Sequence, residues 1–251
     1  AGWGCPWFQY LGKMERNNFC GLCMECIKSC PNDNISVFAR PFAMDTRIKG
    51  YDEAWKAFIM LALAMTYSVT LLGPSGVVKD WANLSEVGNV AGFACYAGIV
   101  WGAALVALPA MWAAGSWTGR KWAGLREVSL KQVFLSYSFM LVPLGLMAWI
   151  AFSLPLIMVN GAYIVSVISD PMGRGWDLFG TAHVPWTPVL PEYTVHLQIV
   201  LLAAGLYFAL KRGWMLAAEL YADKFRALRS FVPAGVLCTV ITLAFVRVYA
   251  G

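Results

Sequence analysis

The apolar residues of this chain gather into five long runs, separated by polar segments that contain glycine and proline. The runs cover residues 57–73, 90–114, 131–168, 193–210 and 231–249. About 20 apolar residues in a helix cross the hydrocarbon core of a bilayer. The pattern therefore predicts a mainly α, polytopic membrane protein of about five transmembrane helices, with a membrane domain over residues 51–251.

The third run is longer than a single span requires and contains its own breaks. Ser129 and Gln132 have the form of a capping box, which predicts a helix start. Pro143 and Pro155 fall inside the run, and a proline removes a helical hydrogen bond and bends the helix. We therefore expect a kinked or broken helix that breaks at Asn160-Gly161 and ends beyond the membrane.

Two patterns predict how the helices use their surfaces. Gly98 and Gly102 form a GxxxG motif, which lets two backbones approach closely and indicates packing against another helix. From Trp214 to Leu228, leucines alternate with charged residues. This second pattern indicates an amphipathic surface helix between the fourth and fifth runs.

The first 50 residues are turn-rich and contain a dense group of cysteines. The motif is C-x2-C-x2-C-x3-C-P, with its thiols at Cys20, Cys23, Cys26 and Cys30. This is the bacterial ferredoxin spacing for a 4Fe–4S cluster. Structural zinc is the alternative, but zinc sites use two separated C-x2-C pairs or mixtures of Cys and His. The motif predicts a ferredoxin-like iron–sulfur segment over residues 1–50.

A second Cys-Pro pair lies upstream of that motif, at Cys5. In a ferredoxin fold a remote Cys-Pro supplies the fourth ligand, so we expect Cys5 to complete a cluster with the first three cysteines of the motif. Cys30 then serves a second cluster, because the fourth cysteine of such a run usually does. The alternative is one cluster held by Cys20, Cys23, Cys26 and Cys30, with Cys5 spare.

Composition agrees with a membrane protein that binds a cofactor. Hydrophobic residues make up 59% of the chain and charged residues 13%, and the mean hydropathy is +0.61, which excludes an ordinary soluble domain. Five of the seven cysteines lie in the first 30 residues, which favours cofactor ligation over a disulfide framework. Lys13, Arg16 and Lys28 are near these thiols in sequence, as counter-charges for a cluster or as ordinary solvated cations.

Other function classes find no support in the sequence. The net charge of +5 is explained by loop charges, and we expect no nucleic-acid partner. Gly173-Arg174-Gly175 does not follow a strand and open a helix, so it fails as a dinucleotide fingerprint. Because Ala1 is not an initiator methionine, we expect the chain to start at a processed or truncated end.

Positive charges are distributed unevenly between the two sides of the predicted helices. Sixteen of the nineteen Lys and Arg residues lie in three segments on one side of the predicted helices. These segments are residues 1–56 before the first helix, residues 114–131 between the second and third helices, and residues 211–230 between the fourth and fifth. Cytoplasmic segments have such an excess. We therefore expect a multi-pass protein of the inner, cytoplasmic membrane, with the cluster facing the cytoplasm.

The opposite side has polar side chains that predict a quinone site. They are Asp177, His183, Glu192, Tyr193 and His196. An ionisable residue at membrane depth is a functional candidate, and here a His or Tyr would bind a quinone carbonyl while Glu192 or Asp177 takes the proton. Interfacial histidines satisfied by water or headgroups are the alternative. Haem is not expected, because its two axial histidines usually come from separate helices and His183 lies in a loop.

These motifs resemble those of the membrane polyferredoxin group, which includes the quinol-dehydrogenase subunit of periplasmic nitrate reduction and the membrane regulator of nitrous-oxide reduction. The resemblance rests on Gly4-Cys5-Pro6-Trp7, similar to the membrane-edge C-x3-C-P element of that group, and on the run from Cys20 to Pro31. The first cysteine of the C-x3-C-P element would fall at Ala1. The resemblance implies electron transfer between the quinone pool and a redox partner through cytoplasmic-side clusters.

We therefore expect a membrane-bound iron–sulfur subunit of an oxidoreductase complex. Its expected partners are other redox subunits, a quinone and the lipid bilayer. One alternative is a non-catalytic membrane anchor of a larger respiratory or photosynthetic complex, in which the cluster is structural. The other is an assembly factor for a metal enzyme.

Overall fold

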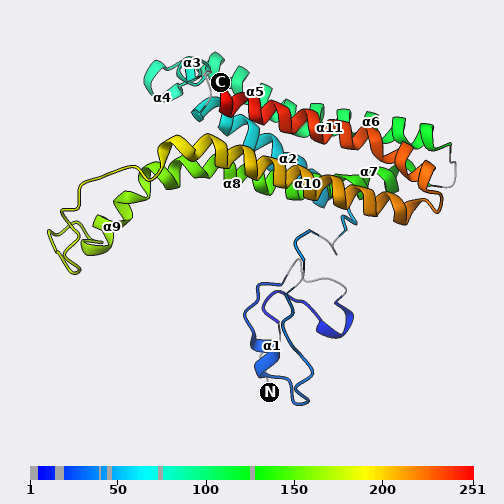
Figure 1. Ribbon diagram of the computed structural model, residues 1–251, viewed down its shortest axis with the longest axis horizontal. Coiled ribbons are helices and arrows are strands. Elements are labelled where there is room, and N and C mark those ends of the chain that lie inside the picture. Colours follow the sequence, from blue (N-terminus) through cyan, green and yellow to red (C-terminus); the bar gives the residue numbers. More distant parts are fainter. Residues whose placement is uncertain (1–4, 15–19, 40, 44–46, 73–75, 125–127) are drawn as a thin grey trace. The chain divides into compact units, whose positions relative to one another are not determined.

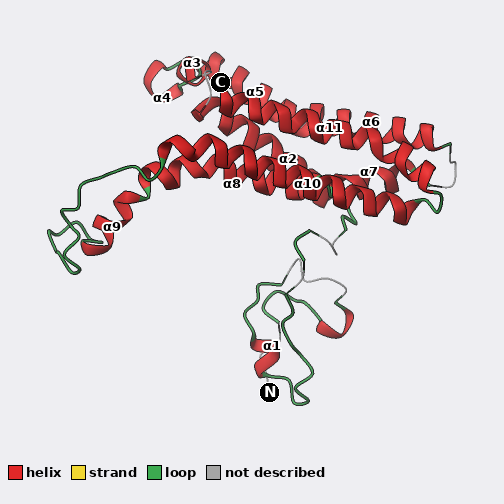
Figure 2. Cartoon of the chain, viewed as in Figure 1, coloured by secondary structure: helices red, strands yellow, loops and turns green. Residues whose placement is uncertain are grey.

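The computed structural model describes residues 5–14, 20–39, 41–43, 47–72, 76–124 and 128–251. The chain divides into two compact units, Ala1–Thr46 and Arg47–Gly251, so the unit boundary falls slightly before the predicted residue 50. Arg16, one of the expected counter-charges, lies outside the described residues. Helices dominate the described ranges, which contain no strand (Figure 2).

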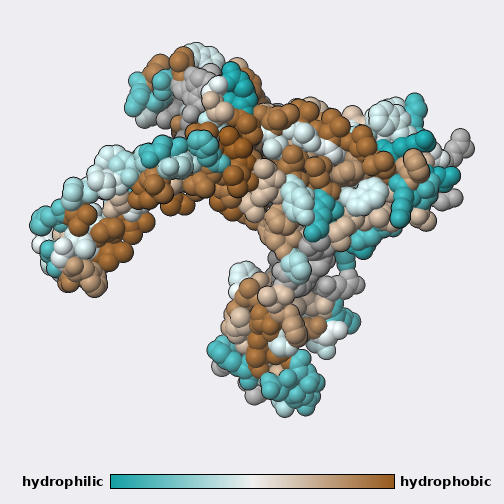
Figure 3. All heavy atoms as spheres, viewed as in Figure 1, coloured by the Kyte–Doolittle hydropathy of each residue, from teal (hydrophilic) through white to brown (hydrophobic). Residues whose placement is uncertain are grey.

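Five helical segments of the described chain are long and apolar enough to cross a membrane, which confirms the predicted multi-pass membrane architecture. These spans are Tyr51–Leu71, Val90–Ala123, Leu130–Asn160, Pro191–Leu220 and Lys224–Ala250 (Figure 1). Large apolar side chains such as Ile99, Val200 and Val240 are more than half exposed, and brown apolar surface is widespread over the helices in Figure 3. Apolar patches of this extent indicate contact with lipid or with other apolar partners.

Most spans combine more than one helical segment. The first span consists of α2 (Tyr51–Tyr67) and the π-helical η2 (Ser68–Leu72). The second consists of α5 (Val90–Gly102), the π-helical η3 (Ala103–Ala107) and α6 (Leu108–Ala123). The third consists of α7 (Leu130–Ser138) and α8 (Leu141–Asn160). The last two consist of η4 (Pro191–Tyr193) with α10 (Thr194–Leu220), and of α11 (Lys224–Ala250). The short helices α3 (Gly76–Trp81) and α4 (Leu84–Val87) join the first two spans, and α9 (Ala162–Ser169) follows the third.

The spans pack around a core of aromatic and aliphatic side chains. α10 contacts both α8 and α11, α11 also packs against α6, and α2 packs against α8. Phe58 and Trp112 are almost completely buried, and their rings meet edge-on with 6.3 Å between centroids. Gly119 of α6 lies directly against the backbone of Ser230 in α11, where a larger residue would clash. Such close approach matters because lipid supplies no hydrophobic force between helices.

The third apolar run, predicted as a kinked or broken helix, forms three separate helices. The capping box of Ser129 and Gln132 starts α7, with 3.2 Å between the Gln132 amide and the Ser129 hydroxyl. A turn at Phe139–Met140 then separates α7 from α8. α8 continues through Pro155 and ends at Asn160, and α9 begins after Gly161, which is the predicted break.

The prediction of a separate amphipathic surface helix from Trp214 to Leu228 is wrong. α10 continues to Leu220, and α11 begins at Lys224, so the two long helices meet with a short turn between them. Asp223 caps α11 by accepting a hydrogen bond from the Phe225 amide at 3.1 Å. Leucines alternate with charges here because both helix ends expose one face and bury the other.

The GxxxG face of α5 remains open within the described chain. A β-carbon built on Gly98 or on Gly102 would meet no atom within 4 Å. The close helix contacts that the structure does make use Gly119 and Gly205 instead, and Gly205 lies against Met147 of α8. No described residue of this unit therefore packs against Gly98 or Gly102, where the sequence predicted a helix.

Candidate metal centre

The Cys5 segment and the Cys20 segment meet through a side-chain contact inside the first unit. The indole of Trp7 lies against Gly21, so closely that any β-carbon at residue 21 would overlap its ring. A turn that begins at Cys5 sets the position of this segment, with the Phe8 amide 3.0 Å from the Cys5 carbonyl oxygen. The glycine between the first two cysteines of the motif thus gives the second Cys-Pro element room to pack beside them.

The backbone around Cys23 adopts an uncommon conformation. Leu22 and Met24, on either side of this cysteine, have φ values of 52° and 64°. The left-handed region costs a residue with a β-carbon about 1–2 kcal/mol. Non-glycine residues held there are frequent at ligand-binding sites, where the geometry of the loop has a function. Two of them within three residues make this loop a candidate binding site on structural grounds.

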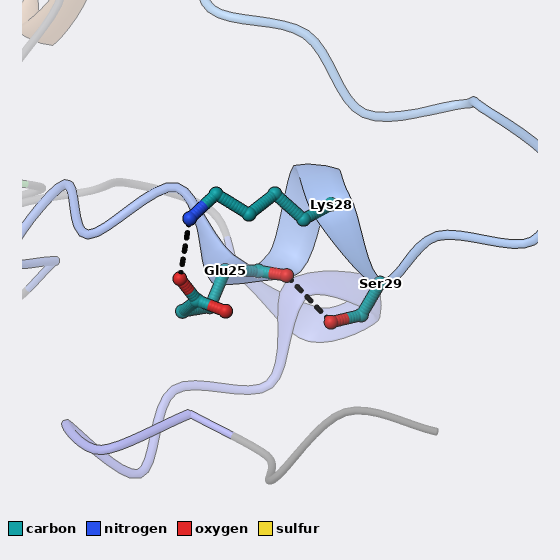
Figure 4. Close-up of polar contacts among 3 residues, drawn as sticks. All are labelled: Glu25, Lys28 and Ser29. Carbon is teal, nitrogen blue, oxygen red and sulfur yellow. Dashed lines mark hydrogen bonds and ion pairs between the residues drawn. The ribbon is translucent and has the colours of Figure 1, made fainter.

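A single helical turn follows and carries Cys26. This helix, α1 (Glu25–Lys28), begins directly after Met24. Figure 4 shows the contacts that stabilise it: Lys28 Nζ lies 2.8 Å from Glu25 Oε1, and the Ser29 hydroxyl donates to the Glu25 carbonyl oxygen at 2.6 Å. The turn fixes the spacing between Cys26 and Cys30.

Lys28 is paired within its own helix rather than directed only at the thiols. Its hydrogen bond to Glu25 and the charge of that carboxylate raise the pKa of Lys28 above the ordinary value, and the charge of Cys23 acts in the same direction. Lys28 therefore stays protonated at neutral pH and contributes a positive charge near Cys23. Lys13 is an exposed residue at the end of η1 (Leu11–Lys13).

One cavity of about 730 Å³ lies in this unit, and all five predicted ligands line it. They are Cys5, Cys20, Cys23, Cys26 and Cys30. Cys20, Cys26 and Cys30 are partly buried, and no thiol among the five forms a disulfide. Apolar side chains, among them Tyr10, Leu22 and Phe38, complete the wall. The structure thus brings together five cysteines that are spread over 26 positions of the sequence.

The geometry of a single metal ion can be compared with these side chains. Among the described residues, no three side chains of His, Cys, Asp or Glu lie close enough together to hold a single metal ion. A zinc ion needs its thiolates at about 2.3 Å from one centre. A 4Fe–4S cluster instead takes each thiolate at a different iron atom.

Cys30 has a contact that the other four cysteines lack in the described hydrogen bonds. The backbone N–H of Asn34 donates to Cys30 Sγ at 3.4 Å. Such N–H···S bonds stabilise negative charge on sulfur and tune the potential of a cluster. Since Cys30 lines the same cavity as the others, both predicted ligand sets remain available to one site.

The residues predicted for a quinone fall into two groups at the surface. Asp177 and His183 form the first group, in which the two side chains interact electrostatically. Tyr193 and His196 form the second, with 6.5 Å between the ring centroids. Glu192 is exposed in η4, next to Tyr193. The N–H of Ala182 lowers the pKa of Asp177, helped by the Ser169 hydroxyl and the charge of His183 and opposed by desolvation. A carboxylate held in its ionised form is a weak base, so the lowered pKa of Asp177 does not favour the predicted proton-accepting role for this residue.

Sequence reasoning missed the buried polar groups of the bundle. The side chain of Arg212 is 3% exposed, and its Nη1 lies 3.7 Å from Glu219 Oε1, while Arg47 Nη2 lies 2.9 Å from Glu219 Oε2. In a second group the Tyr137 hydroxyl donates to Ser230 Oγ at 2.9 Å, and Ser230 Oγ donates to the Tyr221 hydroxyl at 3.1 Å. A sequence signal existed for Arg212 and Glu219, which lie seven residues apart and so share one helix face.

The assignment of this site rests on the residues themselves. The donor set is rich in thiols, the loop around it is strained, and the cavity is lined by both Cys-Pro elements. No protein-family model, curated protein or solved structure matches this chain.

Proposed function

We propose that this protein is a membrane-bound electron-transfer subunit that binds a 4Fe–4S cluster and relays electrons between the quinone pool and a redox partner. The observation that supports it best is the shared cavity of the five N-terminal cysteines. Five membrane-spanning helices in the same chain support a location where quinones dissolve. When bound, such a cluster supplies reversible one-electron transfer.

The residues of the first unit have separate roles in this proposal. Cys5, Cys20, Cys23 and Cys26 are the proposed ligands, and Cys30 is reserved for a second cluster. The contact of Trp7 with Gly21 supports the inclusion of Cys5, because it holds the two cysteine segments together. Apolar side chains form part of the cavity wall, and solvent exposure is one of the properties that set a cluster's potential.

The second unit holds the cluster-binding unit at the membrane and offers a place for the quinone. His196 and Tyr193 are the proposed hydrogen-bond donors to a quinone carbonyl, and Glu192 is the proposed proton acceptor. The excess of Lys and Arg in the N-terminal and connecting segments supports a cytoplasmic-side location for the first unit, in an inner membrane.

Metal analysis of the purified, membrane-extracted protein tests the proposal. We expect four iron atoms and four acid-labile sulfides per chain, and a signal in electron paramagnetic resonance that appears on reduction. Cys23→Ala should abolish both. Cys95→Ala is the matched control, because Cys95 is an exposed thiol in α5 that does not line the cavity. Zinc in place of iron, or a cluster that resists reduction across the range of quinone potentials, would overturn the proposal.

A further inference from the structure

α9 carries an apolar stripe that no part of the described chain covers. One residue, Gly161, separates the helix from the end of the third span, and the helix sequence, AYIVSVIS, contains no charged residue. Ile164, Val167 and Ile168 are 58%, 56% and 54% exposed. Residues at these spacings lie on one face of a helix. The exposed apolar side chains therefore form a continuous stripe.

The other side of α9 is held by the loop that follows it. The Thr181 hydroxyl donates to the Val165 carbonyl oxygen at 2.7 Å, and the Leu178 amide donates to the Ser169 carbonyl oxygen at 3.1 Å. The ring of Trp186 stacks on Tyr163 with 5.8 Å between centroids and an interplanar angle of 19°. α9 and its loop thus have internal support on one face only.

Hydrogen bonds also tie this loop to the end of the third span. Trp186 Nε1 donates to the Val159 carbonyl oxygen at 2.7 Å, and the Val189 amide donates to the Met158 carbonyl oxygen at 2.8 Å. Asp170 accepts the amides of Arg174 and Gly175 at 2.8 and 2.7 Å, which closes the turn after α9. These bonds hold the loop after α9 against the C-terminal end of the third span.

We propose that α9 is an interfacial helix whose stripe of Ile164, Val167 and Ile168 inserts into the lipid leaflet at this end of the third span. This inference concerns the membrane contact alone, so it stands apart from the proposed electron transfer. Three features favour lipid as the occupant. The stripe has no charge, it lies one residue from a membrane span, and aromatic side chains flank it.

The flanking aromatics have the chemistry of a membrane interface. Trp and Tyr are enriched where the hydrocarbon core meets the headgroups, because each ring combines apolar surface with a polar atom. Trp186 and Tyr163 stack at the start of α9, and the guanidinium of Arg174 lies 5.6 Å from the Trp176 ring in the following loop. A cation beside this ring is well placed for a lipid phosphate.

Site-specific photocrosslinking in the intact protein tests this inference. Benzoylphenylalanine would replace Ile164 or Val167, and the protein would be reconstituted in vesicles of phosphatidylethanolamine and phosphatidylglycerol. Illumination should give a mass increase of one phospholipid at both positions. Ser85 is the control for exposure, because it is an exposed residue of α4 in the connection on the same side of the membrane. Labelling there should be several-fold lower.

A second pair of variants tests whether the stripe itself is responsible. Val167→Asn places an amide within the stripe and should reduce lipid adducts at Ile164 several-fold. Ser166→Asn changes the half-buried opposite face and should leave them unchanged. Equal lipid labelling at Ser85, protein–protein crosslinks in place of lipid adducts at Ile164, or an unchanged yield in Val167→Asn would overturn the inference.

Discussion

Gln198 in α10 donates a hydrogen bond to the carbonyl oxygen of Ala151 in α8, with 2.9 Å between the two atoms. Ala151 lies four residues before Pro155, whose ring nitrogen has no hydrogen to offer that carbonyl. Because Gln198 is only 3% exposed, its amide replaces the missing helical bond inside the apolar bundle. The fourth span therefore satisfies the backbone of the third.

Replacing Gln198 with leucine should lower the free energy of unfolding by about 1 kcal/mol, because the Ala151 carbonyl loses its donor. In a Pro155→Ala background the helix supplies a backbone N–H, so the same replacement should cost less. Unfolding in mixed detergent micelles across this double-mutant cycle measures the difference. Equal costs in the two backgrounds would contradict this role for Gln198.

Gly21→Ala should reduce the iron content of the purified protein, because the added methyl group displaces the Trp7 indole and separates the two cysteine segments. Gly98→Ala is the matched control. Its methyl group meets open space, and alanine favours a helix over glycine by up to about 1 kcal/mol. Iron and sulfide analysis distinguishes the two variants, and full iron occupancy in Gly21→Ala would show that the contact is dispensable.

Single cysteine variants should separate the two ligand sets. If Cys5 completes the cluster, Cys5→Ala should lose the signal of the reduced cluster, and Cys30→Ala should keep it. Cys30 lines the same cavity, and its sulfur accepts a hydrogen bond from the Asn34 N–H. A redox titration followed by electron paramagnetic resonance provides the measurement. The reverse result would assign the cluster to the four motif cysteines.

The loop after α9 should loosen in acid. The pKa of Asp177 is lowered from 3.8, chiefly by the Ala182 N–H, so the carboxylate stabilises the loop above pH 3.8 and loses this effect as the pH falls through its folded pKa. Amide exchange at Ala182 should be faster in Asp177→Ala than in the parent protein at pH 7. The difference should shrink below pH 3.8. The Val189 amide, which bonds to Met158, serves as the internal control.

Sequence periodicity and spacing were sufficient for the broad architecture. The apolar runs predicted five membrane-spanning helices, and the Ser129–Gln132 capping box and the break at Asn160-Gly161 were also found. These features are local, because run length, capping and glycine chemistry act within a few residues. The same local reasoning failed between Trp214 and Leu228, where an alternating pattern came from the ends of two helices that each bury one face.

By itself the sequence determined the spacing of the cysteines, the apolar spans and the uneven distribution of positive charge, since composition and spacing are written along one dimension. Only the tertiary structure decided that Trp7 packs on Gly21 and that all five cysteines share a cavity. It also decided that Gln198 donates a hydrogen bond to the Ala151 carbonyl oxygen, which Pro155 leaves without a helical partner. Each of these contacts joins residues distant in the chain. Their physical basis is close packing and the need to pair buried polar groups, which depend on where the backbone folds back on itself.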